Sequence, residues 1–490
     1  MINKLEKKEK NILIGVFILL LIIHFPLMIK NIISADILLN NSYYSGYSWE
    51  LSLGRFGLFI IGLLKSYLSI PHIDLILSYL LISVSTYYLF KLFDIKETIP
   101  IVLAILFITI NPITSSILLF HYCSVGYLLA FFLSILSIYC NYHIENKYLK
   151  YIFPIICMVI SLSMYQAYLS CITALWLIYH IHLLLKKELK IKDALIYLLL
   201  ILGSIMIYFI GMKLSQIIFH IDMSYYSNAD SIGLSTLLLI PQKIINSYQL
   251  FYEFYFTDIM MKTKVFHNNI INLFILIGFV GLIIKKAYQQ KIGKKEWIIL
   301  ILSILLLPVF MNSIIFVISE SKLQLLMSTS YLLLPIYLFS LITKKEERMI
   351  CCILFGLLIR NYYIQIQATY LTLENTFNTY HTVVEAAINQ NSNKLNKEFA
   401  IIGRIPEKDS IYEEISKLNY GYISDEDLFW DEHYNKKIAF ERFTRQYFGL
   451  NLTFTDEDKY NEIIKYPNNK LIYEKNNVIV INMNELKKEN

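Results

Sequence analysis

Long apolar runs separated by short polar segments occupy the chain from about residue 11 to residue 367. A helix that crosses a membrane needs about 20 mostly apolar residues, and by this rule the sequence predicts about eleven transmembrane helices. The predicted spans are residues 11–32, 73–90, 99–117, 122–140, 149–164, 166–185, 194–212, 268–284, 297–316, 324–342 and 349–367. The pattern therefore predicts an α-helical polytopic membrane protein.

Residues 56–70 form an apolar run that is too short to be a further span. Its apolar part ends at Leu64, and Lys65 and Ser66 follow at once. A segment of this length is typical of a helix that lies in the membrane interface or dips part-way into the bilayer. We therefore expect a short interfacial helix at this position.

The distribution of Lys and Arg predicts the orientation, because cytoplasmic loops carry an excess of these residues. With the N-terminus inside, the cytoplasmic segments contain 20 Lys and Arg residues and the outer connections contain seven. These cytoplasmic segments are 1–10, 91–97, 141–150, 186–193, 285–295 and 343–348. The sequence thus predicts a multi-pass protein of a bacterial inner or plasma membrane, with its N-terminus cytoplasmic and its C-terminus extracytoplasmic.

This topology collects the polar connections on the outer face, mainly in the outer loops 33–72 and 213–267. Beyond about residue 370 the apolar run ends, although the last helix can continue out of the membrane. Residues 399–403 and 478–481 are typical of buried strands with polar helical pieces between them. We expect a transmembrane domain over residues 1–370 and a small extracytoplasmic α/β domain over residues 371–490.

Composition agrees with a membrane protein and argues against nucleic-acid binding. The 490 residues are 56% hydrophobic and 17% charged, whereas soluble proteins carry about 25% charged residues. The net charge of +6 comes from short lysine clusters between apolar runs, a pattern that sets orientation and does not grip a phosphate backbone. The six cysteines lie in or beside apolar segments without metal spacing, so we interpret them as packing residues.

Asp36 is the candidate with the clearest chemistry. It stands a few residues beyond the first predicted span, near the depth of the lipid headgroups. Sugar transfer from a lipid phosphate needs a base for the acceptor hydroxyl and donors or cations for the departing phosphate. Asp36 can be that base, and Glu50 in the same loop can assist it or hold a metal. Spacing alone leaves the alternative open that both are ordinary loop acids.

Two arginines are candidates for binding the phosphate. Arg55 follows Gly54 at the start of the interfacial segment, where a guanidinium can pair with a phosphate through two hydrogen bonds or extend to the headgroups. Arg360 lies well inside the last predicted span, where an ionisable group is costly and usually faces a polar cavity or a partner. The structural alternative for Arg360 is a buried ion pair with a carboxylate such as Asp36.

Tyr165 and Gln166 lie in a very short outer turn between two predicted spans. They can hydrogen-bond sugar hydroxyls or the loop that carries Asp36, or they can pack and cap the turn. His121 and Tyr122 can line the same cavity. Because no other ligand stands at metal spacing from His121, we predict no metal site.

Several of these features resemble one known family, the Gtr type II glucosyltransferases. The resemblance is carried by Asp36 after the first span, by Tyr-Tyr-Ser-Gly-Tyr-Ser-Trp-Glu-Leu-Ser-Leu-Gly-Arg-Phe at 43–56, and by Ser-Met-Tyr-Gln-Ala at 163–167. It covers roughly residues 10–370. The family is grouped with GT-C-type enzymes, which have a site on the first extracytoplasmic loop and use a polyprenyl-phosphate-linked sugar to modify a surface glycan.

The resemblance implies that Asp36 is the base and that Arg55 helps to form the site. It also implies a hexose donor, expected to be glucose, a cell-surface glycan as acceptor, no cofactor, and a separate flippase and donor synthase as partners. Many relatives carry a second acidic residue beside the first, whereas Ala35 and Ile37 flank Asp36 here. This departure argues against a metal-dependent mechanism.

Two other functions stay open at the level of sequence. A polysaccharide polymerase or ligase would act on lipid-diphosphate glycans. A flippase or transporter for lipid-linked sugars would need a polar path through the bilayer, yet only Arg360 lies deep and no internal repeat is visible. The sequence therefore favours a glycosyltransferase.

Overall fold

The computed structural model describes residues 7–40, 42–43, 47–223, 239–257, 268–317, 324–403 and 433–487. Its first half contains α1 (Lys7–Ile23), α2 (Pro26–Ile29), α3 (Ala35–Asn40), β1 (Ser42–Tyr43), α4 (Tyr47–Ser52), α5 (Phe56–Leu64), β2 (Leu68–Ser69), α6 (Pro71–Leu92), α7 (Thr98–Thr109), α8 (Pro112–Leu119), α9 (His121–His143), α10 (Leu149–Met164), α11 (Tyr168–Leu185) and α12 (Ile191–Phe219).

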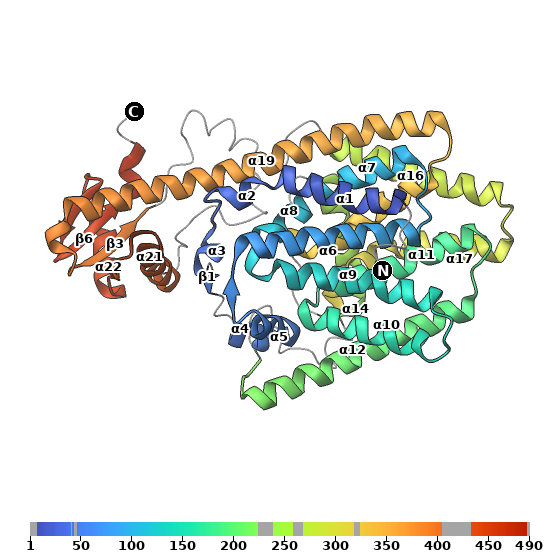
Figure 1. The fold of residues 1–490 in the computed structure, drawn as a ribbon, viewed down its shortest axis with the longest axis horizontal. Coiled ribbons are helices and arrows are strands. Elements are labelled where there is room, and N and C mark those ends of the chain that lie inside the picture. The colour runs from blue at the N-terminus through green and yellow to red at the C-terminus, as the bar shows by residue number, and fades with distance from the viewer. Residues whose placement is uncertain are drawn as a thin grey trace.

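The second half contains α14 (Ile240–Phe256), α16 (Asn268–Gln289), α17 (Lys294–Met311), η3 (Ser313–Phe316), η4 (Leu325–Met327), η5 (Thr329–Leu332), α18 (Leu333–Leu341), α19 (Lys345–Gln390), η6 (Ser392–Lys394), β3 (Glu398–Ile402), α21 (His433–Phe448), β4 (Thr453–Phe454), α22 (Glu457–Lys465), β5 (Ile472–Lys475), β6 (Val478–Asn482) and η7 (Met483–Lys487). Helices form one large bundle, and a small sheet lies beyond one of its ends (Figure 1).

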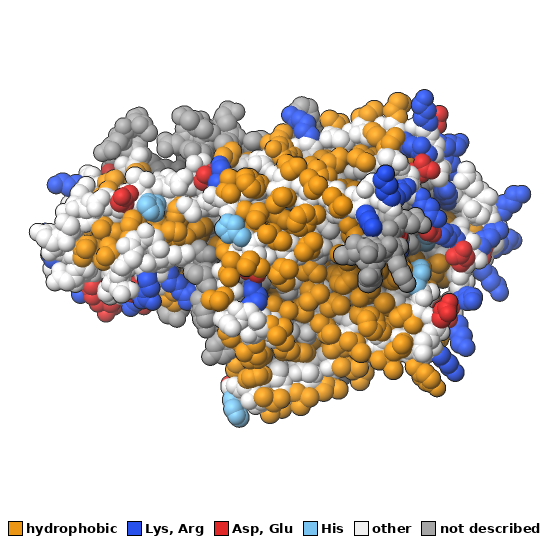
Figure 2. Space-filling model, viewed as in Figure 1, with side chains coloured by type: hydrophobic (Ala, Val, Ile, Leu, Met, Phe, Trp, Pro, Cys, Tyr) orange, Lys and Arg blue, Asp and Glu red, His pale blue; other side chains and the backbone are white. Residues whose placement is uncertain are grey.

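The bundle has the helices of a membrane protein. Within the described residues, α6, α9, α11, α12, α16 and α19 are long and apolar enough to cross a bilayer. The pair α7 and α8 is bent by 42° and makes a seventh span if counted as one. A broad hydrophobic surface covers the middle of the bundle (Figure 2).

The predicted count of eleven spans goes beyond these six or seven helices. α1 and α10 lie on predicted spans but have only 17 and 16 residues. A helix of this length extends about 25 Å, less than the roughly 30 Å of a typical hydrocarbon core. α17 lies on another predicted span but begins with Lys294, Lys295 and Glu296. The count of eleven therefore stays a prediction.

The segment after Arg55 forms a short helix, as the sequence predicts. α5 has nine residues, which corresponds to a length of only about 14 Å. It packs tightly on its neighbours, because a Cβ on Gly57 would lie 2.4 Å from Ser163 Oγ and a Cβ on Gly126 would lie 2.2 Å from Leu58 Cδ2. The two glycines therefore allow α5 to approach α10 and α9 closely.

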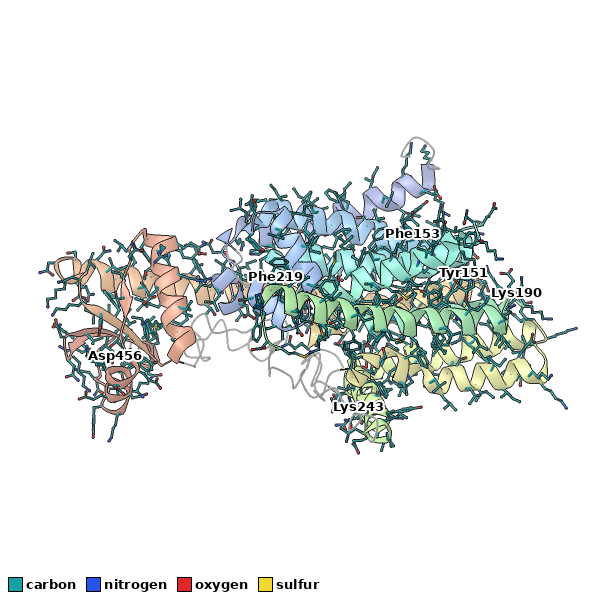
Figure 3. All side chains as sticks on the ribbon, turned by 90° about the horizontal axis from the view of Figure 1, so that it is seen from below. Tyr151, Phe153, Lys190, Phe219, Lys243 and Asp456 are labelled. Atoms are coloured by element: carbon teal, nitrogen blue, oxygen red, sulfur yellow. The ribbon has the colours of Figure 1, made fainter. Side chains whose placement is uncertain are left out.

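Five of the six segments that the sequence predicts to be cytoplasmic, all except 141–150, are joined by ion pairs, and we call this part of the bundle the basic end. Lys91 pairs with Glu9 (3.0 Å), Arg348 with Glu97 (3.2 Å), Lys186 with Asp94, and Lys285 with Glu347. Lys and Arg side chains gather there, away from the small sheet (Figure 2). Figure 3 shows that α12 begins beside Lys190 at this end and finishes at Phe219 at the other.

α19 connects the bundle to the small sheet as one helix of 46 residues, about 69 Å long (Figure 1). Its Tyr370 hydroxyl lies 2.7 Å from Nδ1 of His24, whose Nε2 lies 3.0 Å from the carbonyl oxygen of Thr109. The Glu374 carboxylate accepts from Lys30 at 2.7 Å. These contacts fix α19 to the segment that leads into α3, and the predicted domain boundary at residue 370 falls inside this helix.

The sheet beyond α19 has four strands in the order β4-β3-β6-β5. β3 and β6 are parallel, with Glu398 opposite Val478, and they lie where the sequence predicts buried strands. Both strands are almost wholly buried, which agrees with their continuous apolar runs. α21 covers part of this sheet and also packs against α3, so this distant part of the chain touches the helix that carries Asp36.

Candidate functional site

Asp36 lies in the first turn of α3 and is half-buried. The next two residues, Ile37 and Leu38, are 2% and 1% exposed, and each contributes about 1.5–3 kcal/mol by burial. The Ser34 hydroxyl accepts a hydrogen bond from the backbone N–H of Ile37 (3.4 Å). A helix of six residues is marginal alone, so this burial and the packing on α9 and α21 hold Asp36 in place.

Glu50 and Arg55 form the second part of the site. Glu50 is 4% exposed on α4, and its Oε2 lies 3.4 Å from Nη1 of Arg55. The chain turns between them at Gly54, whose φ of +77° favours glycine. The backbone N–H of Arg55 donates to the Glu50 carbonyl oxygen at 2.7 Å, which closes this turn. The buried Glu50 carboxylate therefore orients the Arg55 guanidinium.

Tyr165 supports the guanidinium of Arg55. The Arg55 Cζ lies 4.7 Å from the centre of the Tyr165 ring, and that ring stacks on Tyr127 with centres 4.5 Å apart. The Tyr127 hydroxyl also accepts from Arg55 Nη1 at 3.4 Å. The predicted turn is present, since α10 ends at Met164 and α11 begins at Tyr168. Tyr165 is thus placed under the cation, and a direct contact with sugar stays a prediction.

Gln166 holds the backbone of the loop that carries Arg55. Its Nε2 donates to the carbonyl oxygen of Leu53 (2.5 Å) and to the hydroxyl of Tyr208 (2.8 Å). The Tyr208 hydroxyl in turn donates to the carbonyl oxygen of Gly54 (3.2 Å). Of the alternatives that the sequence leaves open, these contacts favour hydrogen bonding to the loop.

Helix α9 connects the segments that carry Asp36 and Arg55. It packs against α3, and its Tyr127 hydroxyl accepts from Arg55 Nη1. Five of the predicted site residues, Asp36, Glu50, Arg55, Tyr165 and Gln166, therefore lie on segments at one end of the bundle (Figure 1). We call this the Asp36 end: α3, α4, the start of α5, the start of α9, and the turn 165–167.

Arg360 lies on α19, outside the segments that make up the Asp36 end. It lies on α19 about three turns before Tyr370, or roughly 15 Å along the helix axis. Its side chain is exposed, and Nη1 donates to Oδ1 of Asn361 at 3.2 Å. The Asn361 amide then donates to Oδ1 of Asn268 at 2.7 Å. This polar group joins α19 to α16 within the bundle, and a role of Arg360 in substrate binding stays a prediction.

A second ion pair, which the sequence did not predict, lies beside the site. Lys65 Nζ lies 2.6 Å from Oδ1 of Asp74, and the Asp74 side chain is only 1% exposed. The sequence does carry a signal for this pair, because Asp74 stands at the start of a long apolar run. An ionisable residue at such a position is rarely buried without a partner. His121 lies nearby, with its Nδ1 3.2 Å from the Ser69 hydroxyl.

The described part of the chain contains no group of three or more His, Cys, Asp or Glu side chains arranged to hold a metal ion. Several segments that the sequence predicts at the outer face lie outside the described residues, namely 41 and 44–46 of the aromatic loop, 224–238 and 258–267 of loop 213–267, and 318–323. Within loop 213–267, α14 buries Ser247, Leu250 and Phe254, which lie on one face at helical spacing.

Comparison with protein families gives one match. The model described as glucosyl transferase GtrII matches residues 25–339, which is more than half of the chain. The match includes Asp36, Glu50, Arg55 and the turn at Tyr165 and Gln166, and it ends before α19. No curated protein and no solved structure matches the chain.

Proposed function

Because the chain belongs to the GtrII glucosyl transferase family, we propose that it moves a glucosyl residue from a polyprenyl-phosphate-linked donor to a cell-surface glycan. The observation that carries this proposal is that one helix, α9, packs against α3, which carries the half-buried Asp36, and contacts through Tyr127 the Arg55 guanidinium that Glu50 orients. Transfer from a lipid phosphate needs a base and a cation in one place.

In the proposed reaction Asp36 takes the proton of the acceptor hydroxyl. The hydroxyl oxygen attacks the anomeric carbon, and the bond from that carbon to the phosphate oxygen breaks. The bonding electron pair leaves with the phosphate, and configuration at the anomeric carbon inverts. Arg55 stabilises the charge that develops on the departing phosphate, because its guanidinium can donate two parallel hydrogen bonds to phosphate oxygens.

The other residues of the Asp36 end hold these two groups in position. Glu50 and Tyr165 fix the guanidinium by an ion pair and by stacking. Gln166 fixes the turn before it through the carbonyl oxygen of Leu53. A displacement of about 1 Å in such a group can lower a rate about 100-fold, so positioning residues matter for rate as well as for stability.

The proposed orientation puts the basic end in the cytoplasm and the Asp36 end at the outer face. The lysine distribution supports this assignment, since the positively charged ends of bacterial membrane proteins face inward. The donor would then be made by a synthase inside and moved outward by a separate flippase. The C-terminal sheet would lie outside the membrane, where it packs through α21 against α3.

The test uses membranes that contain the full chain and a radiolabelled polyprenyl-phospho-glucose donor. We expect label to enter glycan with the wild type, and we expect Asp36→Asn to lower the rate by about 100-fold or more, since general base catalysis contributes about 10²–10⁴. Asp36→Glu should keep part of the activity, because the carboxylate is retained.

Two further assays separate the alternatives. Use of a lipid-diphosphate glycan as the preferred donor would instead identify a polymerase or ligase. Movement of the labelled lipid across a vesicle membrane without sugar transfer would identify a flippase. Amounts of each variant in the membrane must be equal for the rates to be compared.

A further inference from the structure

The segment that leads into α3 is held by α19 at both of its ends. This segment, residues 24–30, contains α2, whose four residues include no buried side chain. At its start, Nδ1 of His24 lies 2.7 Å from the Tyr370 hydroxyl, and at its end the Lys30 ammonium donates to the Glu374 carboxylate at 2.7 Å. Figure 1 shows α19 passing α2 on its way to the small sheet. Two polar contacts with one helix therefore fix both ends of this segment.

The contact at His24 is fully buried, and its hydrogen bonds have a defined direction. The Nε2 atom of His24 lies 3.0 Å from the carbonyl oxygen of Thr109, which can only accept, so Nε2 donates. In the neutral imidazole Nδ1 then accepts from the Tyr370 hydroxyl. The oxygen of that hydroxyl lies 2.8 Å from Ser115 Oγ, which can donate to it. These hydrogen bonds join the residue after α1 to α7, α8 and α19.

The same face of α19 continues to the helix that packs against α3. Four of its residues follow one another at spacings of four, three and four, which places them on one side of the helix: Tyr370, Glu374, Phe377 and His381. The Phe377 ring meets the Tyr447 ring with centres 4.8 Å apart, and His381 stacks on Phe448 at 4.7 Å. Tyr447 and Phe448 belong to α21, which packs against α3. A stretch of α19 about 17 Å long thus contacts both the segment before α3 and the helix beside it.

These contacts bear on Asp36, which follows Lys30 by six residues and lies in the first turn of α3. Burial of Ile37 and Leu38 attaches α3 to the bundle, but apolar burial is non-directional and does not by itself define the position of a short helix. Hydrogen bonds between defined atoms set distance and direction. A displacement of about 1 Å in a reacting group can lower a rate about 100-fold. The hold of α19 on this segment is therefore expected to affect the rate.

We propose that Tyr370 and Glu374 are positioning residues for the reaction. They hold the segment before α3, and α19 also holds α21 against α3, so that the Asp36 carboxylate stays where it can take the proton of the acceptor. The inference rests on the proposed function, because it takes Asp36 to be the base. It adds to the reaction a part of the chain that the family match does not cover, since that match ends at residue 339. Both residues act through α3 and not on the substrate.

The first experiment measures kcat and the KM for labelled polyprenyl-phospho-glucose in membranes with equal amounts of each full-length variant. Tyr370→Phe removes the hydroxyl that donates to His24 but keeps the ring, and Glu374→Lys replaces the pair with Lys30 by a repulsion. Each should lower kcat about 10-fold or more and leave the KM within about twofold, because α3 is displaced while donor contacts are kept. The double variant Lys30→Glu with Glu374→Lys restores the pair and should recover roughly half of the wild-type kcat or more.

Two matched controls separate positioning from a general loss of structure. Tyr337→Phe also removes the hydroxyl of a fully buried tyrosine, and this hydroxyl has no hydrogen-bond partner among the described residues. Glu9→Lys reverses a similar pair at the basic end. Glu9 and Lys91 are 3.0 Å apart with side chains 22% and 39% exposed, against 21% and 39% for Glu374 and Lys30. Both controls should keep the wild-type kcat, and losses equal to those of Tyr370→Phe and Glu374→Lys would contradict the proposal.

The second experiment measures backbone amide hydrogen exchange of residues 31–40 by mass spectrometry of the purified full chain, without an assay of activity. Exchange should be about 10-fold faster in Tyr370→Phe and in Glu374→Lys than in the wild type, because local opening of α3 becomes easier, and the double variant should reverse the effect of Glu374→Lys.

Three results would overturn the proposal: unchanged exchange in both single variants, a wild-type kcat despite faster exchange, or a double variant that stays as slow as Glu374→Lys. Failure of the proposed function is distinguishable from these results. If the wild type transfers no glucose, the proposed function fails, and the exchange rates alone then confirm or contradict that Tyr370 and Glu374 hold α3.

Discussion

The two ends of the helix bundle use charge in different ways. At the basic end, Asp94 and Glu97 are partly exposed and pair with lysine and arginine side chains of other connecting segments. At the Asp36 end, the carboxylates of Glu50 and Asp74 are buried, and each holds one cation beside aromatic or apolar groups. The first arrangement joins connecting segments, whereas the second fixes single charged groups in a low-dielectric setting.

The difference matters because the strength of an ion pair depends on its surroundings. Exposed pairs contribute about 0–1 kcal/mol, while removal of one partner of a buried pair costs about 3–5 kcal/mol. We therefore expect substitutions of the buried carboxylates at the Asp36 end to change rate and stability strongly, and substitutions of Asp94 or Glu97 at the basic end to change both weakly.

Arg55→Ala should lower the rate of glucosyl transfer about 10- to 100-fold, because hydrogen bonds to a charged group contribute about 1.5–3 kcal/mol. Arg55→Lys should recover only part of the rate, since lysine lacks the planar fork and the stacking on Tyr165. The measurement is initial rate with labelled donor at saturating concentration. If both variants transfer sugar at the wild-type rate, Arg55 is not part of the site.

Gly54→Ala should destabilise the loop by about 1–3 kcal/mol, because a left-handed backbone is strained for alanine. Its Cβ would also lie 2.7 Å from Met212 Sδ and 2.8 Å from the Tyr208 hydroxyl. Thermal unfolding in detergent measures the effect. Gly203→Ala is the control, since a Cβ there meets no atom within 4 Å. Equal stability of the two variants would argue against a tight turn at Gly54.

Gln166→Met should lower stability by about 1 kcal/mol and lower the transfer rate as well. The substitution keeps the side-chain volume but removes the hydrogen bonds to Leu53 and Tyr208. Gln249→Met, at an exposed position of α14, is the control and should change neither quantity. A lower stability without a lower rate would mean that the loop does not position Arg55.

Asp94→Asn should cost less than about 1 kcal/mol, because the pair at the basic end is exposed. The pKa of Asp94 lies well below its usual range, since His182 and the Lys186 ammonium face its carboxylate and Lys96 adds a weaker attraction. A lowered carboxyl pKa stabilises the folded state above about pH 4, the ordinary value for aspartate, and this contribution is lost as the pH falls below it.

The measurement is the difference in thermal stability between wild type and Asp94→Asn at pH 7, 5 and 3.5. The small advantage of the wild type should be constant down to about pH 5 and should then decrease. If the stability advantage of the wild type over Asp94→Asn grows as the pH falls, the ionised Asp94 carboxylate does not stabilise the folded state.

Part of the site could be predicted from the sequence because hydropathy and lysine bias determine which connections share an end of the bundle. That reasoning placed Asp36, Arg55, Tyr165 and Gln166 together, although they are far apart in sequence. The partners of these residues could not be predicted in the same way. Tyr127 and Tyr208 lie on helices that are apolar on all sides, so periodicity does not reveal which face meets Arg55 or Gln166.

The fold, like the site, could be predicted from the sequence only in part. Strands β3 and β6 could be predicted from two short apolar runs, and α5 from the position of Lys65. The surroundings of Arg360 could not be predicted from the sequence. They depend on its distance along α19 from other polar groups and on the direction of its side chain. The contact of α21 with α3 joins residues about 400 positions apart, and no local pattern encodes it.

The most direct test of the account compares one carboxylate from each end of the bundle. Glucosyl transfer from labelled polyprenyl-phospho-glucose is measured in membranes with equal amounts of wild type, Asp36→Asn and Asp94→Asn. We expect a loss of about 100-fold or more in Asp36→Asn and a nearly unchanged rate in Asp94→Asn. Wild-type transfer by Asp36→Asn would contradict the assignment of Asp36 as the base.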